Sequence, residues 1–125
     1  MNREESKIQS ECFIWYNNTY CLKFHEPRGL MFSVPNELGG RNAISTALAK
    51  STGLTAGVSD TIVILPSGRL IFVEFKTSTG VQSKSQKEFE QRVTAHGYNY
   101  YIVRSLDEFK EIILYLHIAR ERLHN

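Results

Sequence analysis

The sequence predicts an α/β fold in which helices cover a small central sheet. Two apolar runs rich in β-branched residues, 61–65 and 70–76, flank Pro66-Ser67-Gly68-Arg69. Pro at the second turn position and Gly at the fourth are typical of a type I turn, so the runs are expected to form a hairpin. Apolar residues at helical spacing precede and follow this hairpin. The alternation of helices and strands predicts a mixed sheet flanked by helices.

The remaining elements follow from local signals. Ile8, Cys12 and Trp15 share one helical face at 100° per residue, which predicts a helix over 4–17. The signals further along the chain predict extended segments at 20–24 and 30–34, a helix at 42–51 stopped by Gly53, a helix from about 83 to 96 ending at Gly97, a strand at 100–103 and a last helix from Ser105.

Composition limits the possible classes of protein. A chain of 125 residues that is 42% hydrophobic is expected to form one domain over residues 1–125. Fifteen basic against thirteen acidic residues exclude a broadly polybasic surface. We expect a cytoplasmic protein, because the N-terminal residues lack the apolar core of a signal peptide and no run could span a membrane. Cys12 and Cys21 are expected to be free thiols.

Charged residues lie where the predicted hairpin brings its ends together. Asp60 opens the first run, and Glu74 and Lys76 close the second. Because side chains alternate along a strand, Glu74 and Lys76 share a face with Leu70 and Phe72. Two carboxylates and an ammonium group therefore converge on one mostly apolar face. This set suits a divalent cation and phosphodiester hydrolysis.

A structural explanation exists for each of these groups. A Glu-x-Lys pair on a strand is commonly a solvated face or a device that protects a sheet edge. The apolar neighbours of Glu74 favour the functional interpretation, because clustered carboxylates there need a counter-charge. Glu5 lies near the apolar stripe of the first helix and is a further candidate ligand. It could equally stabilise the helix N-terminus, and Glu11 is the reserve.

The start of the helix near residue 83 also has two interpretations. Ser83-Lys84-Ser85-Gln86 is a capping box, which explains Ser83 and Gln86 structurally. A helix N-terminus that overhangs the carboxylates, with Lys84 and Lys87 beside it, would also suit a phosphate group.

Several separate segments together resemble one nuclease family. They are Glu5…Gln9, Val34-Pro35-Asn36…Gly39-Gly40-Arg41, Gly53-Leu54…Gly57-Val58-Ser59-Asp60, Glu74-Phe75-Lys76 and Ser83-Lys84-Ser85-Gln86. This ordered combination, over about residues 4–109, resembles the virus-type replication-repair nuclease (VRR-NUC) domain of the PD-(D/E)xK superfamily. Glu37-Leu38 interrupt its usual Pro-Asn-Gly-Gly loop, and Ser59 stands where Pro is common. Neither departure involves a catalytic carboxylate.

The resemblance implies a restriction-endonuclease-like fold and a role for each candidate. Asp60, Glu74 and Glu5 would bind Mg²⁺ or Mn²⁺ with the backbone carbonyl of Phe75, Lys76 would activate water, and Gln86 would support the site. We expect Asn36, Arg41, Lys84 and Lys87 to contact DNA. A stand-alone chain of this size resembles the members of the family found in phages and prophages. The resemblance implies that this protein forms a homodimer that cuts branched DNA such as four-way (Holliday) junctions, without membrane attachment. A catalytically silent nucleic-acid-binding module of the same fold is the alternative.

Overall fold

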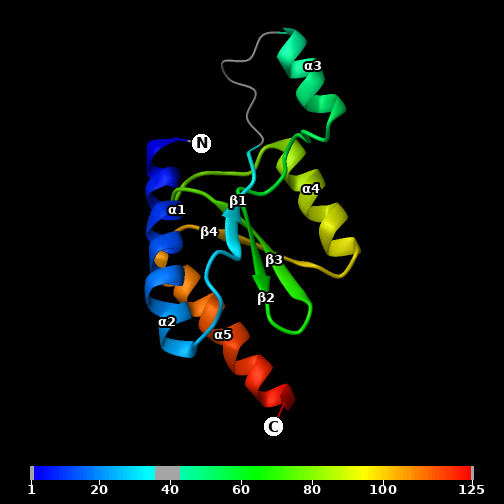
Figure 1. Ribbon diagram of the computed structural model, residues 1–125. Helices are drawn as coiled ribbons and strands as arrows, with labels where there is room; N and C mark the ends of the chain where they lie inside the picture. The colour runs from blue at the N-terminus through cyan, green and yellow to red at the C-terminus, as the bar shows by residue number, and fades with distance from the viewer. Residues whose placement is uncertain (1, 36–42, 125) are drawn as a thin grey trace. The chain divides into compact units, whose positions relative to one another are not determined.

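The computed structural model describes residues 2–35 and 43–124. Along the chain, the helices and strands shown in Figure 1 are α1 (Arg3–Trp15), the π-helical turn η1 (Tyr16–Tyr20), α2 (Cys21–Phe24), β1 (Met31–Ser33), α3 (Ala43–Ser51), β2 (Thr61–Leu65), β3 (Arg69–Phe75), α4 (Lys84–Ala95), β4 (Asn99–Val103) and α5 (Leu106–His124).

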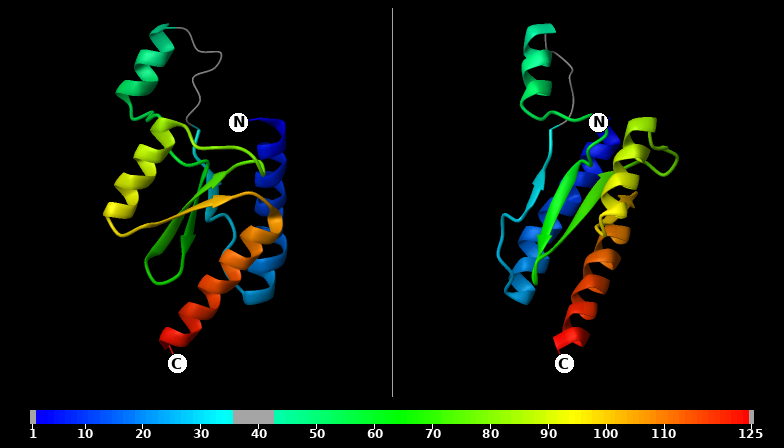
Figure 2. Two further views of the ribbon diagram at one scale, coloured as in Figure 1. Left: turned by 180° about the vertical axis from the view of Figure 1, so that it is seen from behind. Right: turned by 90° about the vertical axis from the view of Figure 1, so that its right-hand side faces the viewer.

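The four strands form one sheet in the order β1-β2-β3-β4. β2 is antiparallel to both β1 and β3. β4 follows β3 through α4, a connection that can be traced in Figure 2. The N–H of Lys76, just past β3, donates to the carbonyl of Val103 at the end of β4. The two strands therefore end side by side and run parallel, which makes the sheet mixed and confirms the predicted α/β class.

The hairpin of β2 and β3 is confirmed, but its predicted turn type is wrong. The register pairs Thr61 with Val73 and Leu65 with Arg69, so residues 66–68 form the link. Ser67, the third turn residue, has φ 65°, whereas a type I turn needs a φ near −90° there. A short link between twisted strands favours turns with positive φ, because these match the right-handed twist of the strands.

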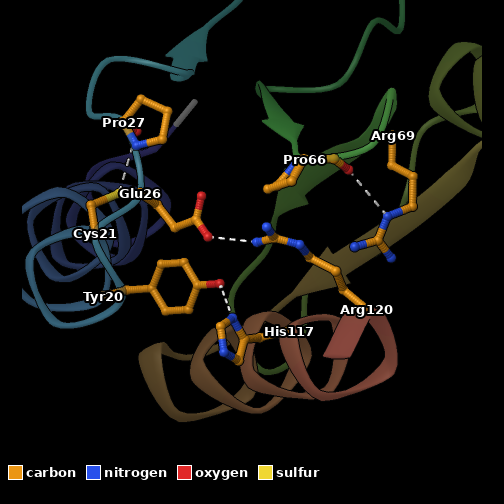
Figure 3. Close-up of polar contacts among 8 residues, drawn as sticks. All are labelled: Tyr20, Cys21, Glu26, Pro27, Pro66, Arg69, His117 and Arg120. Carbon is orange, nitrogen blue, oxygen red and sulfur yellow. Dashed lines mark hydrogen bonds and ion pairs between the residues drawn. The ribbon is translucent and has the colours of Figure 1, made fainter. Parts of the chain in front are cut away.

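The chain divides into two compact units. The first comprises Met1–Gly29, Phe75–Gly80 and Ile102–Asn125. Its core is aromatic: Phe109 of α5 is fully buried and lies edge-on to Trp15 and Tyr16. Figure 3 shows two polar contacts in the same unit: Tyr20 and His117 share a hydrogen bond of 2.9 Å, and Arg120 donates to Glu26 at 2.6 Å.

The extended segment predicted at residues 20–24 is helical instead. α1 continues without a break through η1 into α2, and the chain leaves the helix only at His25, which has a left-handed backbone. Tyr20 stacks on Tyr16 and packs against Phe24 and the ring of His117. Aromatic residues favour strands only weakly, so this packing outweighs their strand propensity.

The second unit comprises Leu30–Glu74 and Val81–Tyr101. One face of its hairpin supplies buried core residues: Thr61, Val63, Leu65, Ile71 and Val73. On the other face, Phe72 lies edge-on to Phe89 of α4. α4 therefore covers the sheet face that also carries residue 74, because alternate side chains of a strand share a face.

The other predicted elements are confirmed to within a few residues. α3 matches the helix predicted at 42–51 over the residues that the structure describes, and β1 lies within the predicted segment 30–34. α4 begins with the predicted capping box at Ser83. α5 follows Ser105, whose hydroxyl accepts from the N–H of Glu108. The carboxylate of Glu108 accepts from the N–H of Arg104 at 3.0 Å.

Two further findings concern thiols and membranes. Cys12 and Cys21 are free and buried, and burial raises the pKa of Cys12 to about 12. Both thiols are therefore protonated at neutral pH, as expected of structural cysteines. Among the described residues, no helix has both the length and the apolar character needed to cross a bilayer.

Candidate active site

Asp60 directly precedes β2, and Glu74 is the penultimate residue of β3. Thr61 pairs with Val73, so the register continued by one residue sets Asp60 opposite Glu74. Residues directly opposite one another point to the same face with Cβ atoms about 4.5–5.5 Å apart. Glu74 is 0% exposed and Asp60 is half-buried. The register of the hairpin therefore supports the predicted convergence of the two carboxylates, which stays a prediction.

Hydrogen bonds on both sides fix the backbone at Asp60. The carbonyl of Asp60 accepts from the N–H of Val34, just past β1, at 2.9 Å. The buried hydroxyl of Ser59 donates to the carbonyl of Thr61, and that of Thr61 donates to the carbonyl of Val73, both at 3.1 Å. Ser59 is thus a structural residue that ties the segment before β2 to the hairpin.

Gly57 holds the same segment against α4. Its φ is 81°, and a Cβ built on it would lie 2.2 Å from the carbonyl oxygen of Ser85 and 2.8 Å from the nitrogen of Gln86. These are backbone atoms in the first turn of α4, so only a glycine permits this approach. The route to Asp60 therefore depends on close contact with the helix that covers the carboxylate face.

Two neutral donors hold the carboxylate of Glu74. Gln82 Nε2 donates to Oε1 of Glu74 at 3.1 Å and to Oε1 of Glu90 at 2.9 Å. The hydroxyl of Tyr100 also donates to Oε1 of Glu74. Burial, followed by this hydrogen bond, raises the pKa of Tyr100 well above its usual range. Tyr100 therefore stays protonated at neutral pH and acts as a donor.

Phe75 is the last residue of β3, and Lys76 follows it; both belong to the first unit. Lys76 is half-buried, and its backbone is held by β4 through the bond to Val103. The roles predicted for the amine of Lys76 and the carbonyl of Phe75 stay predictions.

Arg104 fixes the loop that follows Lys76. Its Nη1 donates to the carbonyls of Thr77 at 2.6 Å and Gly80 at 2.8 Å. A Cβ at Gly80 would lie 3.4 Å from Cδ of Lys76, so this loop borders the stem of the lysine. Arg104 thereby stabilises the backbone beside the predicted catalytic amine.

The structure gives Glu5 and Glu11 local partners within α1. Glu5 forms a capping box with Asn2: its N–H donates to Asn2 Oδ1 at 2.8 Å, and its carboxylate accepts from the N–H of Asn2. Glu11 lies 4.0 Å from Lys7, one helical turn away. Glu5 therefore contributes to the N-terminal cap of α1, and its role as a metal ligand stays a prediction.

Two of the predicted DNA contacts, Lys84 and Lys87, lie on α4. Gln86 completes the capping box by accepting from the N–H of Ser83 at 2.8 Å, whereas the amide that reaches Glu74 is that of Gln82. Lys84 and Lys87 are exposed, and Lys84 lies 3.9 Å from Glu88. Both lysines could therefore meet a phosphate backbone. Asn36 and Arg41 lie outside the described residues.

The donor chemistry of Asp60 and Glu74 fits Mg²⁺ or Mn²⁺, since both ions prefer oxygen ligands. Within residues 2–35 and 43–124, no three His, Cys, Asp or Glu side chains gather closely enough to hold a metal ion. Mg²⁺ commonly binds through one or two carboxylates and keeps several water molecules. A pair of opposed carboxylates is therefore a sufficient protein contribution.

Sequence reasoning missed Tyr100, Gln82 and Arg104. Tyr100 carried one signal: side-chain alternation along β4 sets it on the opposite face from its neighbours Asn99 and Tyr101, but this applies only once the strand is known. Gln82 and Arg104 lie in the segments that flank α4 and β4, where no periodicity applies.

Comparison with known proteins identifies the family and the fold of the chain. The family model of the VRR-NUC domain matches residues 3–107. A solved "VRR_NUC domain protein" has a TM-score of 0.69 at 20% identity, covering 91% of this chain and 88% of that one. A second structure, "VRR_NUC domain", has a TM-score of 0.58 at 23% identity, covering 90% and 96%. No curated protein sequence matches significantly. At these identities the structural similarity establishes the fold alone.

Proposed function

We propose that this chain, because it belongs to the VRR-NUC domain family of nuclease-type domains, is a metal-dependent endonuclease that hydrolyses DNA phosphodiesters. The observation that carries the proposal is the β2–β3 register, which pairs Thr61 with Val73 and, continued by one residue, sets Asp60 opposite Glu74. Like charges directly opposite one another destabilise a sheet. A divalent cation between two such carboxylates removes this repulsion, and a purely structural strand pair has no need of them.

The chain's own residues divide the chemistry among them. Asp60 and Glu74 would hold Mg²⁺ or Mn²⁺, with Glu5 and the carbonyl of Phe75 as further proposed ligands. A bound divalent cation supplies a Lewis acid that activates water and offsets charge on the scissile phosphate. Lys76 would orient the attacking water or stabilise the negative charge of the transition state.

The substrate would be held from several sides. We assign contacts with the DNA backbone to Lys84 and Lys87 at the exposed start of α4, with Gln86 supporting the site from the same turn. A helix N-terminus favours phosphate oxygens. Asn36 and Arg41, which precede α3 in the sequence, are further proposed contacts.

Branched DNA is the proposed substrate class, and the charge balance supports it. A chain with fifteen basic and thirteen acidic residues lacks the cationic surface that tight, sequence-independent binding to long linear duplex requires. We expect a four-way junction to be cut at least about ten-fold faster than linear duplex of equal length in the same Mg²⁺ buffer, as monitored on denaturing gels. Equal rates would contradict junction selectivity. Binding without cleavage in Mg²⁺ or Mn²⁺ would instead favour the silent module.

A homodimer would supply the two active sites that symmetric cutting of a junction needs. The exposed apolar residues of α5, Tyr115 at 68% and Ile118 at 51%, offer material for an interface. Light scattering at micromolar concentration is expected to give twice the 14.4 kDa mass of one chain. A measured mass of 14.4 kDa would contradict the proposed homodimer.

A further inference from the structure

We propose that Tyr100 is a positioning residue of the active site and that Gln82 shares this role. The inference rests on the proposed metal-dependent function of Asp60 and Glu74. Both donors act on the same atom, Oε1 of Glu74, and both come from outside the hairpin that carries the carboxylates. They therefore set the orientation of Glu74 independently of the strand register.

The two donors come from the segments that precede and follow α4 in the chain. Gln82 precedes the N-cap of α4, and Tyr100 lies on β4 after the helix. The ring of Tyr100 lies 6.2 Å from that of Phe89, which in turn packs edge-on against Phe72 of β3. The rotamer of Tyr100 is thus restrained by aromatic packing, so its hydroxyl has a fixed place.

Gln82 has a second function, because its amide also donates to Glu90. One neutral group thereby separates two carboxylates that would otherwise repel each other on the α4 side of the site. Partners that orient a ligating carboxylate typically contribute about 10- to 100-fold to metal affinity or activity. Tyr100 and Gln82 fit this role, since neither carries charge and both donate to the carboxylate.

The test is the affinity for Mn²⁺ of the full chain without DNA, measured by isothermal titration calorimetry. Tyr100→Phe keeps the ring and removes the hydroxyl, and we expect it to raise the dissociation constant about ten-fold. Tyr98→Phe is the matched control: Tyr98 packs on Phe72 in the same unit and is 45% exposed. Its dissociation constant should stay within about two-fold of the wild-type value, as expected of an exposed substitution.

Cleavage supplies the second measurement. Excess Mn²⁺ should restore most of the cleavage rate of Tyr100→Phe, whereas a variant with only a structural defect would stay slow at every metal concentration. If Tyr100→Phe fails to fold, Gln82→Leu removes the other donor, and we expect weaker Mn²⁺ binding in that variant too.

Each outcome separates the two proposals. An unchanged Mn²⁺ dissociation constant in folded Tyr100→Phe and Gln82→Leu, or absence of Mn²⁺ binding by the wild type, would overturn the positioning role. A wild type that binds Mn²⁺ but cuts no DNA would overturn the endonuclease proposal alone. The ratio of the Mn²⁺ dissociation constants of Tyr100→Phe and the wild type would then still decide whether Tyr100 positions Glu74.

Discussion

Glu74→Gln is expected to lower the rate of DNA cleavage by about 100- to 1,000-fold and to leave the fold intact. The amide keeps the shape of the side chain and an oxygen that can accept from Gln82 and Tyr100. It removes the charge that would hold a divalent cation. Metal ions contribute several kcal/mol to such reactions, and about 1.4 kcal/mol corresponds to a ten-fold change in rate. Asp60→Asn should behave in the same way.

Thermal unfolding provides a readout of the same change without DNA. A ligand that binds only the folded state stabilises it by about 2.7 kcal/mol at 100 times its dissociation constant. Mn²⁺ should therefore raise the Tm of the wild type but not that of Glu74→Gln. Glu88→Gln is the matched control, because Glu88 is an exposed carboxylate of α4 that lies 3.9 Å from the exposed Lys84.

Lys76→Ala separates binding of the metal from catalysis. It should slow cleavage and preserve the rise in Tm with Mn²⁺, since the proposed role of Lys76 concerns water or the transition state. Cleavage at the wild-type rate by folded Glu74→Gln would show that the active site has been assigned to the wrong residues.

The hairpin was predictable because its rules act over few residues. A turn signature between two apolar runs sets the register, and alternation then assigns Asp60, Glu74 and Lys76 to one face. The type of turn was not predictable from Pro66 and Gly68 alone. It depends on the twist of the strands and on the three-residue link that the register leaves between them.

The partners of Glu74 were not predictable, because they depend on tertiary structure. Tyr100 is 26 positions from Glu74 along the chain, and only the crossover through α4 brings β4 beside β3. No local pattern specifies which residue of β4 reaches the carboxylate. The same limit explains the helix over residues 20–24, where packing of Tyr20 against Phe24 and His117 outweighs strand propensity.

Gly57→Ala is expected to be among the most damaging single substitutions in the second unit. The new Cβ would lie 2.2 Å from the carbonyl oxygen of Ser85, which is a backbone atom of α4 and cannot rotate away. The left-handed backbone adds about 1–2 kcal/mol for any residue with a Cβ. Steric displacement of packed backbone adds a further 1–3 kcal/mol, by analogy with overpacked cores.

Comparison with Gly97→Ala separates the steric clash at Gly57 from the strain of a left-handed backbone. Gly97 has φ 90°, close to the 81° of Gly57, but a Cβ built on it meets nothing within 4 Å. Only the backbone term applies there, so Gly97→Ala should lower the free energy of unfolding by about 1–2 kcal/mol. Gly57→Ala should lower it by roughly twice as much or more, as measured by urea unfolding.

The rate of DNA cleavage should also fall more in Gly57→Ala than in Gly97→Ala, because Gly57 lies three residues before Asp60. Moving the segment away from α4 would shift Asp60 relative to Glu74, and a displacement of about 1 Å at a catalytic group can cost 100-fold in rate. Folded Gly57→Ala should therefore cut DNA far more slowly than folded Gly97→Ala at the same Mn²⁺ concentration. Equal stability and equal cleavage in the two variants would mean that the close approach of Gly57 to Ser85 does not position the carboxylate of Asp60.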